Sequence, residues 1–153
     1  MTSALLTDRY ELTMIDAALR DGRADRPCVF ELFTRRLPQG RRFGVVAGTG
    51  RFLEALADFR FGDAELAWLR DEGVVSAQTL DWLADYRFSG TISGYREGEV
   101  YFPGSPLLIV EASFAEGVVL ETLALSILNY DSAVASAAAR MVAAADGRPL
   151  AEM

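Results

Sequence analysis

The hydrophobic periodicity of the chain changes near Phe88. Downstream of this residue, short runs rich in β-branched and aromatic residues alternate with glycine and proline turns, which is typical of strands. We expect three short strands, within Gly90–Tyr95, Glu99–Phe102 and Leu107–Glu111. The short turns between them favour a compact antiparallel sheet. A long helical pattern over Ala115–Ala145 follows, so the chain is predicted to have an α+β fold.

The residues before Phe88 predict mostly helices. Asp8 and Glu11 have the spacing of a variant capping box, and Leu12, Ile15 and Leu19 then fall on one helical face.

One strand is expected among these helices, over Pro27–Phe33, with Arg35 and Arg36 at its exit. Further helices are expected over Val45–Phe59 and from N-caps at Asp63 and Ser76.

The size of the chain fits one domain. The sequence has 153 residues, of which 51% are hydrophobic and 24% charged, and it contains no internal repeat or low-complexity linker. We therefore expect a single domain over residues 1–153. Arg148–Met153 resembles the entry into another strand, so the C-terminus is expected to interrupt an element.

Charge and composition limit the possible functions. The net charge is −7, and all 15 basic residues are arginine, which does not favour binding to nucleic acid or to an anionic membrane surface. The chain has no histidine, so it cannot form a Ser-His or Cys-His nucleophile pair or a histidine-ligated metal site. Catalysis by this chain would have to rest on Asp, Glu, Arg or Tyr.

The sequence also carries indications of location. Cys28 is the single cysteine and lies in an apolar run, so we expect a buried thiol in a reducing compartment, with the cytoplasm as the default. The first residues do not have the pattern of a secretory signal. Charged and polar residues interrupt Ala115–Ala145, which argues against a membrane span.

The segment Thr7–Met14 is the strongest candidate for a ligand site. It places Tyr10 and Asp8 at the start of a helix, where free backbone N–H groups and the helix dipole favour an anion and an aromatic ring can stack on a planar ligand. Two simpler explanations compete with this hypothesis. Tyr10 can pack as an ordinary aromatic residue, and Asp8 can serve only as an N-cap.

The adjacent arginines Arg35 and Arg36 are candidates for phosphate binding, because the planar guanidinium matches phosphate oxygens. The alternative is a solvated strand end. The glycines near the start of the second helix match neither dinucleotide nor P-loop patterns, so packing explains them better.

Three further groups of polar residues have explanations that need no ligand. The carboxylate pairs Glu97/Glu99 and Asp81/Asp85 are explained by solvation rather than by acid–base or magnesium chemistry. Asn129-Tyr130-Asp131 interrupts an apolar helix surface and marks either a buried hydrogen-bond site or a contact between helices.

The order of several motifs resembles that of nicotinate phosphoribosyltransferases across nearly the whole chain. The matching segments are Thr7–Met14, Phe30–Pro38, Val46–Gly48, Tyr86–Gly90, Glu97–Pro103 and Leu120–Asn129. The resemblance implies the N-terminal portion of the enzyme: helices, a small antiparallel sheet and one long helix, without the α/β barrel that holds most of the active site in the family.

This resemblance implies synthesis of nicotinate mononucleotide from nicotinate and phosphoribosyl pyrophosphate, in NAD biosynthesis. ATP hydrolysis assists through a phosphorylated histidine, and Mg²⁺ is implied as well. Tyr10 matches the tyrosine that stacks on the pyridine ring across a homodimer interface, Asp8 matches its neighbour, and Arg35 or Arg36 matches an arginine near phosphates.

Because this chain has no histidine to phosphorylate, we expect it to carry no catalytic residue and to be inactive alone. Nicotinamide or quinolinate phosphoribosyltransferase would share the fold and is the nearest alternative. A non-catalytic interaction module is the alternative from another class.

Overall fold

The computed structural model describes residues 4–151 of the chain. In chain order, its elements are η1 (Ala4–Leu6), α1 (Arg9–Arg20), β1 (Pro27–Phe33), β2 (Gly44–Val45), α2 (Thr49–Ala57), α3 (Asp63–Asp71), α4 (Ala77–Asp85), β3 (Thr91–Gly94), β4 (Val100–Tyr101), β5 (Pro106–Ser113), α5 (Phe114–Val118) and α6 (Glu121–Ala145). The predicted α+β class is confirmed.

The strands form two antiparallel sheets rather than one. The larger has the order β1-β5-β3, and the smaller pairs β2 with β4. The prediction of one sheet from the three strands after Phe88 was therefore wrong. Both edges of β5 are occupied by β1 and β3, so β4 pairs with β2 instead. Gly44 permits this pairing, because a Cβ there would lie 2.2 Å from Cζ of Tyr101.

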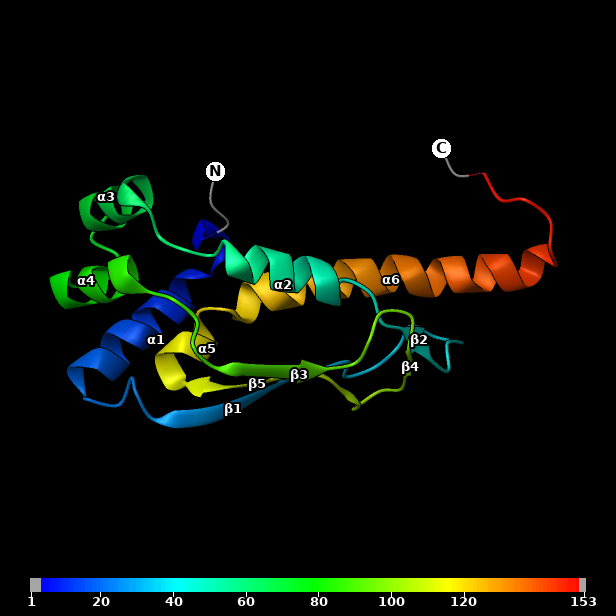
Figure 1. Cartoon of the computed structure of the whole chain (residues 1–153), viewed down its shortest axis with the longest axis horizontal. Helices are drawn as coiled ribbons and strands as arrows, with labels where there is room; N and C mark the ends of the chain where they lie inside the picture. Colours follow the sequence, from blue (N-terminus) through cyan, green and yellow to red (C-terminus); the bar gives the residue numbers. More distant parts are fainter. Residues whose placement is uncertain (1–3, 152–153) are drawn as a thin grey trace.

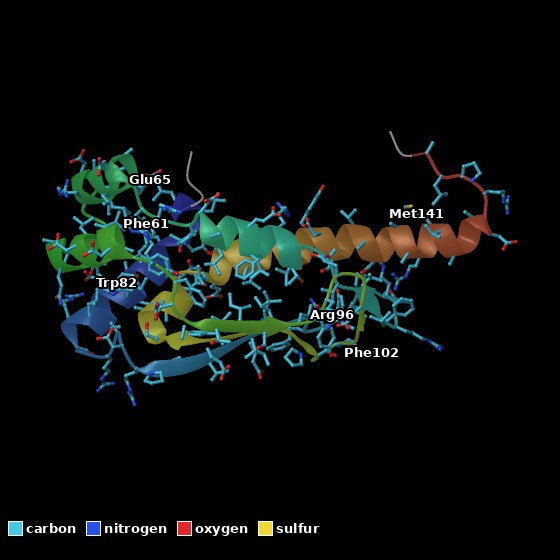
Figure 2. The ribbon with its side chains drawn as sticks, viewed as in Figure 1. Phe61, Glu65, Trp82, Arg96, Phe102 and Met141 are labelled. Atoms are coloured by element: carbon cyan, nitrogen blue, oxygen red, sulfur yellow. The ribbon has the colours of Figure 1, made fainter. Side chains whose placement is uncertain are left out.

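Helices cover one face of the larger sheet (Figure 1). Along β1, exposed residues alternate with half-buried ones such as Phe30 and Leu32, which pack against the main core. Figure 1 shows α6 running along the molecule beside α2, with α1, α3 and α4 gathered at one end. Figure 2 shows Phe61 and Trp82 at this end, and Phe102 and Met141 toward the other.

The predicted long helix over Ala115–Ala145 is divided into α5 and α6. Val119 and Leu120 lie between the two helices, and both are buried in the main core. Ser113 caps α5, with its hydroxyl accepting a hydrogen bond from the Glu116 N–H at 3.4 Å. The turn allows α5 to pack against α1 and β1 while α6 continues past the sheet.

The helix predicted over Val45–Phe59 begins later, at Thr49. Val45 lies in β2, and Gly48 precedes the helix with a φ of 98°. The carboxylate of Glu97 accepts hydrogen bonds from the N–H groups of Gly48 (3.1 Å) and Gly50 (2.9 Å). Glu97 therefore caps α2 and occupies the anion-binding end of this helix.

One of the two other predicted N-caps is correct, and the other is displaced by one residue. Ser76 is the N-cap of α4, as predicted, and accepts a hydrogen bond from the Thr79 N–H at 3.4 Å. The predicted cap Asp63 is instead the first helical residue of α3. Gly62 precedes it, and its N–H donates to Oε2 of Glu65 at 3.1 Å.

The edge of β2 is bound by serines of α6. Ser136 Oγ accepts a hydrogen bond from the Val45 N–H at 2.8 Å. Ser132 Oγ accepts from the Ala47 N–H and donates to the Ala47 carbonyl, each at 3.1 Å. Two small polar residues on an alanine-rich helix thereby satisfy backbone groups of the smaller sheet's edge.

Two features of the C-terminal third complete the fold. One helical stretch among the described residues, Phe114–Ala145, is long and apolar enough by length and composition to cross a membrane, and 44% of its most apolar window is buried inside this fold. The expected strand entry at Arg148–Met153 is not formed over 148–151, and the last two residues lie outside the described range.

Candidate functional site

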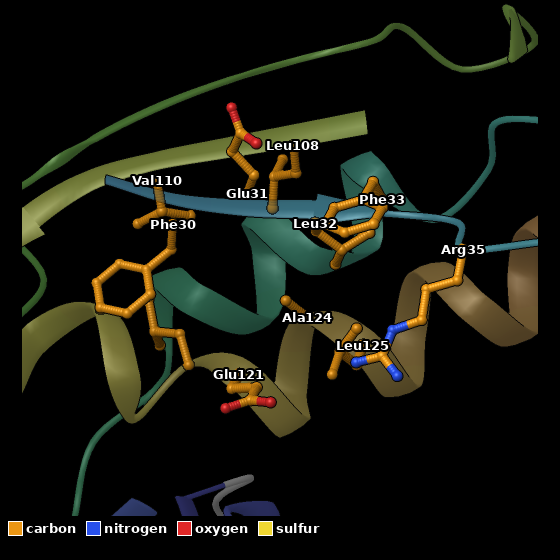
Figure 3. A pocket seen from close by; sticks show the side chains of 12 residues that line it. Phe30, Glu31, Leu32, Phe33, Arg35, Leu108, Val110, Glu121, Ala124 and Leu125 are labelled. Carbon is orange, nitrogen blue, oxygen red and sulfur yellow. The ribbon is translucent and has the colours of Figure 1, made fainter. Parts of the chain in front are cut away.

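Two neighbouring cavities lie between the exit of β1 and helix α6. The smaller has a volume of about 310 Å³ and the larger about 500 Å³. Four residues line both cavities, Leu32, Phe33, Arg35 and Leu125. Since these walls are shared, the two cavities form one groove, whose smaller end is drawn in Figure 3.

The larger cavity gathers the positive charge of the groove. Arg35, Arg36 and Arg41 all line it, opposite Asn129 on α6. Arg35 and Arg36 are exposed, and Arg41 is half-buried. Both predicted phosphate-binding arginines are thus brought together at a concave surface. Arg41 was not singled out from the sequence, although the Pro38-Gln39-Gly40 turn that returns it to the strand exit is visible there; in the structure its N–H donates to the Pro38 carbonyl at 3.1 Å.

Arg35 also reaches the smaller cavity. Its side chain extends from the end of β1 toward α6, beside Leu125 (Figure 3). Apolar side chains of β1, β5 and α6 form most of this cavity, and Glu121 at the start of α6 supplies a carboxylate. The groove therefore has an acidic group at one end and a cluster of guanidinium groups at the other.

Tyr10 lies in the first turn of α1 and is 46% exposed. The structure does not place it in the lining of either cavity. The influence of Glu121, with burial and the other nearby carboxylates, raises the pKa of Tyr10 to about 12. With this exposure, Tyr10 is not a core residue.

Asp8 is exposed and acts as the N-cap of α1. Its backbone N–H donates to Oε2 of Glu11 at 3.1 Å, as in a capping box. This arrangement confirms the predicted helix start, whereas a ligand role for Asp8 stays a prediction.

Glu11 is a key residue that the sequence did not single out beyond its capping role. It is fully buried, and its carboxylate accepts hydrogen bonds from Thr7, from Asp8 and from both the N–H and the hydroxyl of Thr122. Burial raises its pKa, and these bonds, which stabilise the ionised form, offset part of the rise. Glu11 thus joins the starts of α1 and α6.

Within the polar segment Asn129-Tyr130-Asp131, Asp131 and Asn129 have different roles. Asp131 forms a bidentate ion pair with Arg51 of α2, with Nη2–Oδ1 at 2.6 Å and Nε–Oδ2 at 2.9 Å, so the predicted contact between helices is confirmed for this residue. Asn129 lines the larger cavity.

The structure also shows the surroundings of the other carboxylates in the two predicted pairs and of Cys28. Glu99 accepts a hydrogen bond from the Arg96 N–H at 3.0 Å, while Asp81 and Asp85 are exposed on α4. Cys28 is half-buried, so the expectation of a buried thiol was wrong; strand β1 lies at a sheet edge and its side chains alternate between faces. Within residues 4–151, no group of three or more His, Cys, Asp or Glu could hold a metal ion.

Comparison with known proteins gives a consistent family. Residues 5–129 match the family described as the nicotinate phosphoribosyltransferase (NAPRTase) N-terminal domain. The chain is 64% identical over 151 residues to nicotinate phosphoribosyltransferase pncB1 of Mycobacterium tuberculosis. This match covers 99% of this chain and 33% of that protein. It is 36% identical over 138 residues to nicotinate phosphoribosyltransferase of Bacillus subtilis, covering 90% of this chain and 28% of that protein.

A solved structure agrees. The crystal structure of human nicotinic acid phosphoribosyltransferase superimposes with a TM-score of 0.84 at 34% identity, over 96% of this chain and 30% of the human chain. The chain spans about a third of the length of the curated relatives it matches. These matches show that the chain belongs to the nicotinate phosphoribosyltransferase family, within its N-terminal domain.

Proposed function

We propose that a polypeptide containing this chain transfers the phosphoribosyl group of phosphoribosyl pyrophosphate to nicotinate, forming nicotinate mononucleotide and pyrophosphate in NAD biosynthesis. Family membership over residues 5–129 supports this activity. The observation in the structure that favours it most is the arginine-lined groove at the exit of β1, because a transfer that releases pyrophosphate needs sites for phosphate oxygens.

In the proposed reaction the pyridine nitrogen attacks the anomeric carbon of the sugar while the bond from that carbon to the pyrophosphate oxygen breaks. Negative charge develops on the departing pyrophosphate, and Arg35 and Arg36 would stabilise it. Tyr10 would stack on the pyridine ring, with Asp8 beside it, and hold the ring for attack. Most of the work is therefore positioning and electrostatic stabilisation.

ATP hydrolysis and Mg²⁺ belong to this proposal only through the family. The chain has no histidine that ATP could phosphorylate. The described residues also contain no cluster suited to a metal ion, so no step through ATP or magnesium is assigned to them. We further propose that the protein acts in the cytoplasm as a homodimer, and the exposure of Tyr10 is consistent with a tyrosine supplied to a partner subunit.

The activity is tested by measuring conversion of labelled nicotinate to nicotinate mononucleotide with phosphoribosyl pyrophosphate and ATP. The protein used in this assay is a polypeptide that contains these residues together with the rest of the length found in members of the family. We expect turnover of nicotinate and not of nicotinamide or quinolinate. Preference for either of these would instead favour the sister enzymes, and no turnover of any substrate would favour an interaction module.

The 153-residue chain by itself should show no turnover in the same assay. A measurable rate of nicotinate mononucleotide formation by this chain would contradict the proposal that its active site is completed by other segments.

A further inference from the structure

We infer that the larger cavity of the groove binds the diphosphate group of phosphoribosyl pyrophosphate, and that Arg41 and Asn129 are ligands of this group. They act there together with the two arginines predicted from the sequence. This inference rests on the proposed function, because that function supplies the diphosphate. It adds two residues to the site, and it assigns the diphosphate, rather than the single phosphate of the same substrate, to this cavity.

The charge of the larger cavity is opposite to that of the whole chain. The sequence has 22 acidic and 15 basic residues and a net charge of −7. None of the described acidic residues lines the larger cavity, whereas three arginines do. Guanidinium groups that line one cavity repel one another, and a bound polyanion compensates this repulsion. The cavity is therefore suited to an anion with several charges.

The guanidinium groups of this cavity are not paired with carboxylates. In the part of the chain that the structure describes, no hydrogen bond or ion pair engages the side chains of Arg35, Arg36 and Arg41. Arg51 differs, because it forms a bidentate ion pair with Asp131. The donors of the three cavity arginines are thus available to phosphate oxygens, which a planar guanidinium binds through two parallel hydrogen bonds.

A tight turn after β1 determines the position of Arg41. Its N–H donates to the Pro38 carbonyl at 3.1 Å, and Gly40 within the turn has a φ of 80°, which glycine adopts without steric cost. Arg35 lies before the turn and extends from the end of β1 toward α6 (Figure 3). The cavity therefore receives guanidinium groups from both ends of one short turn.

Helix α6 supplies the uncharged polar wall of the cavity. The Ser132 hydroxyl is already engaged by the N–H and the carbonyl of Ala47, each at 3.1 Å. Asn129 lines the same cavity and forms no hydrogen bond through its amide to any residue within 4–151. Its NH₂ group can donate to phosphate oxygens. Asn129 is thus the residue of this wall that we assign to the ligand.

The size and the donors of the cavity favour a diphosphate over a single phosphate. Its volume of about 500 Å³ falls within the range of about 300–1,000 Å³ that is usual for small-molecule sites. A diphosphate has more negative charge and more acceptor oxygens than a single phosphate. It can therefore accept from the strand exit, from the turn and from α6 at the same time.

The first experiment measures binding of pyrophosphate to the 153-residue chain by isothermal titration calorimetry, without magnesium. We expect one site per chain and an affinity for pyrophosphate at least about tenfold higher than that for inorganic phosphate, because further charged hydrogen bonds form. Arg41→Gln should weaken pyrophosphate binding about tenfold, and Asn129→Ala about fivefold. Arg41→Lys should restore part of the affinity, since it keeps the charge and loses the planar fork.

The matched control is Arg70→Gln, which removes the same charge from an exposed position on α3. It should leave pyrophosphate binding unchanged, and circular dichroism should show the same fold for every variant. Equal losses in Arg41→Gln and Arg70→Gln would overturn the inference, because net charge alone would then explain the binding. Equal affinities for pyrophosphate and inorganic phosphate, or no binding of pyrophosphate, would also overturn it.

The second experiment identifies the source of the diphosphate, because ATP also contains one. It uses the extended polypeptide, which contains these residues together with the rest of the length found in members of the family. Arg41→Gln should raise the KM for phosphoribosyl pyrophosphate about tenfold and leave the KM for ATP and for nicotinate unchanged. A rise in the KM for ATP alone would overturn the assignment to the phosphoribosyl substrate.

The two experiments separate this inference from the proposed function. If the extended polypeptide does not turn over nicotinate although the chain binds pyrophosphate through Arg41, the proposed function fails and the diphosphate site remains. If nicotinate is turned over and Arg41→Gln changes neither pyrophosphate binding nor the KM for phosphoribosyl pyrophosphate, only the assignment of the cavity fails.

Discussion

The side chain of Glu11 and both donors of Thr122 form a hydrogen-bonded joint between the first and the last long helices. Oε1 of Glu11 lies 3.0 Å from the Thr122 nitrogen and 2.6 Å from its hydroxyl, and Oε2 lies 3.1 Å from the nitrogen of Asp8. One buried carboxylate therefore satisfies N–H groups at two helix starts.

Glu11→Gln should destabilise the fold strongly. The amide NH₂ would face either the donors of Thr122 or those of Thr7 and Asp8, and two donors would lose their acceptor. We expect the free energy of unfolding to fall by about 2–4 kcal/mol. Urea denaturation monitored by circular dichroism measures the loss. The control Glu54→Gln, an exposed position on α2, should change stability by less than about 0.5 kcal/mol, and an equally small change for Glu11→Gln would contradict the role of the joint.

Asp16 should make stability depend on acidic pH. Its carboxylate accepts hydrogen bonds from the Ser76 N–H (2.8 Å) and the Thr79 hydroxyl (2.7 Å) and pairs with Arg20 (2.8 Å). Burial tends to raise the pKa of Asp16, but these partners outweigh it and lower the pKa from 3.8 to about 2. The ionised form is thus stabilised by folding, so its contribution is complete above pH 3.8 and is lost as the pH falls through about 2.

The corresponding variant is Asp16→Asn. At pH 6 it should be less stable than the unmodified chain by on the order of 1 kcal/mol, after allowing for solvent screening. Urea denaturation at pH 6, 3 and 2 should show this difference shrinking as the pH falls. A difference that stays constant over this range would show that ionisation of Asp16 is not involved. Asp71→Asn, at the exposed end of α3, serves as the control.

Local sequence patterns predicted the type of most elements and the limits of some, and tertiary contacts decided the limits of the others. The start of α1 and the extent of β1 follow from capping and strand patterns, which act over a few residues. The pairing of β2 with β4 depends on the ring of Tyr101 over Gly44, which lie far apart in the sequence. The end of α5 depends on burial of Val119 and Leu120 in a core that no local pattern specifies.

The residues of the candidate site also divide into those that a local sequence pattern indicates and those that tertiary contacts place. Arg35 and Arg36 could be proposed from the sequence, because a guanidinium pair at a strand exit is a local signal. Glu121 could not, since it reaches the groove from the distant helix α6, whereas Arg41 follows a local turn signal at Pro38-Gln39-Gly40. Collinear motifs identified the family because they combine many weak local signals in one order.

Gly117→Ala should be destabilising although alanine favours helices. A Cβ at this position would lie 2.3 Å from Cε2 of Phe30, so α5 and β1 could not keep their present spacing. We expect a loss of about 1–3 kcal/mol in the free energy of unfolding, as for other overpacked cores. Combining it with Phe30→Leu should recover part of the loss. Gly50→Ala is the control, because its nearest neighbour is an oxygen of Glu97 at 3.8 Å, and a similar loss there would argue against the contact with Phe30.

Arg35→Gln should weaken binding of phosphoribosyl pyrophosphate more than Arg36→Gln, because Arg35 lines both cavities of the groove whereas Arg36 lines only the larger one. In the extended polypeptide, we expect Arg35→Gln to raise the KM for phosphoribosyl pyrophosphate about tenfold, the effect of losing one charged hydrogen-bond donor. Steady-state kinetics at saturating nicotinate measures it. Arg70→Gln, on the exposed end of α3 and away from the groove, should behave like the unmodified protein. If Arg35→Gln instead raised only the KM for nicotinate, Arg35 would be a pyridine-carboxylate ligand, and the assignment of the groove to phosphate would be wrong.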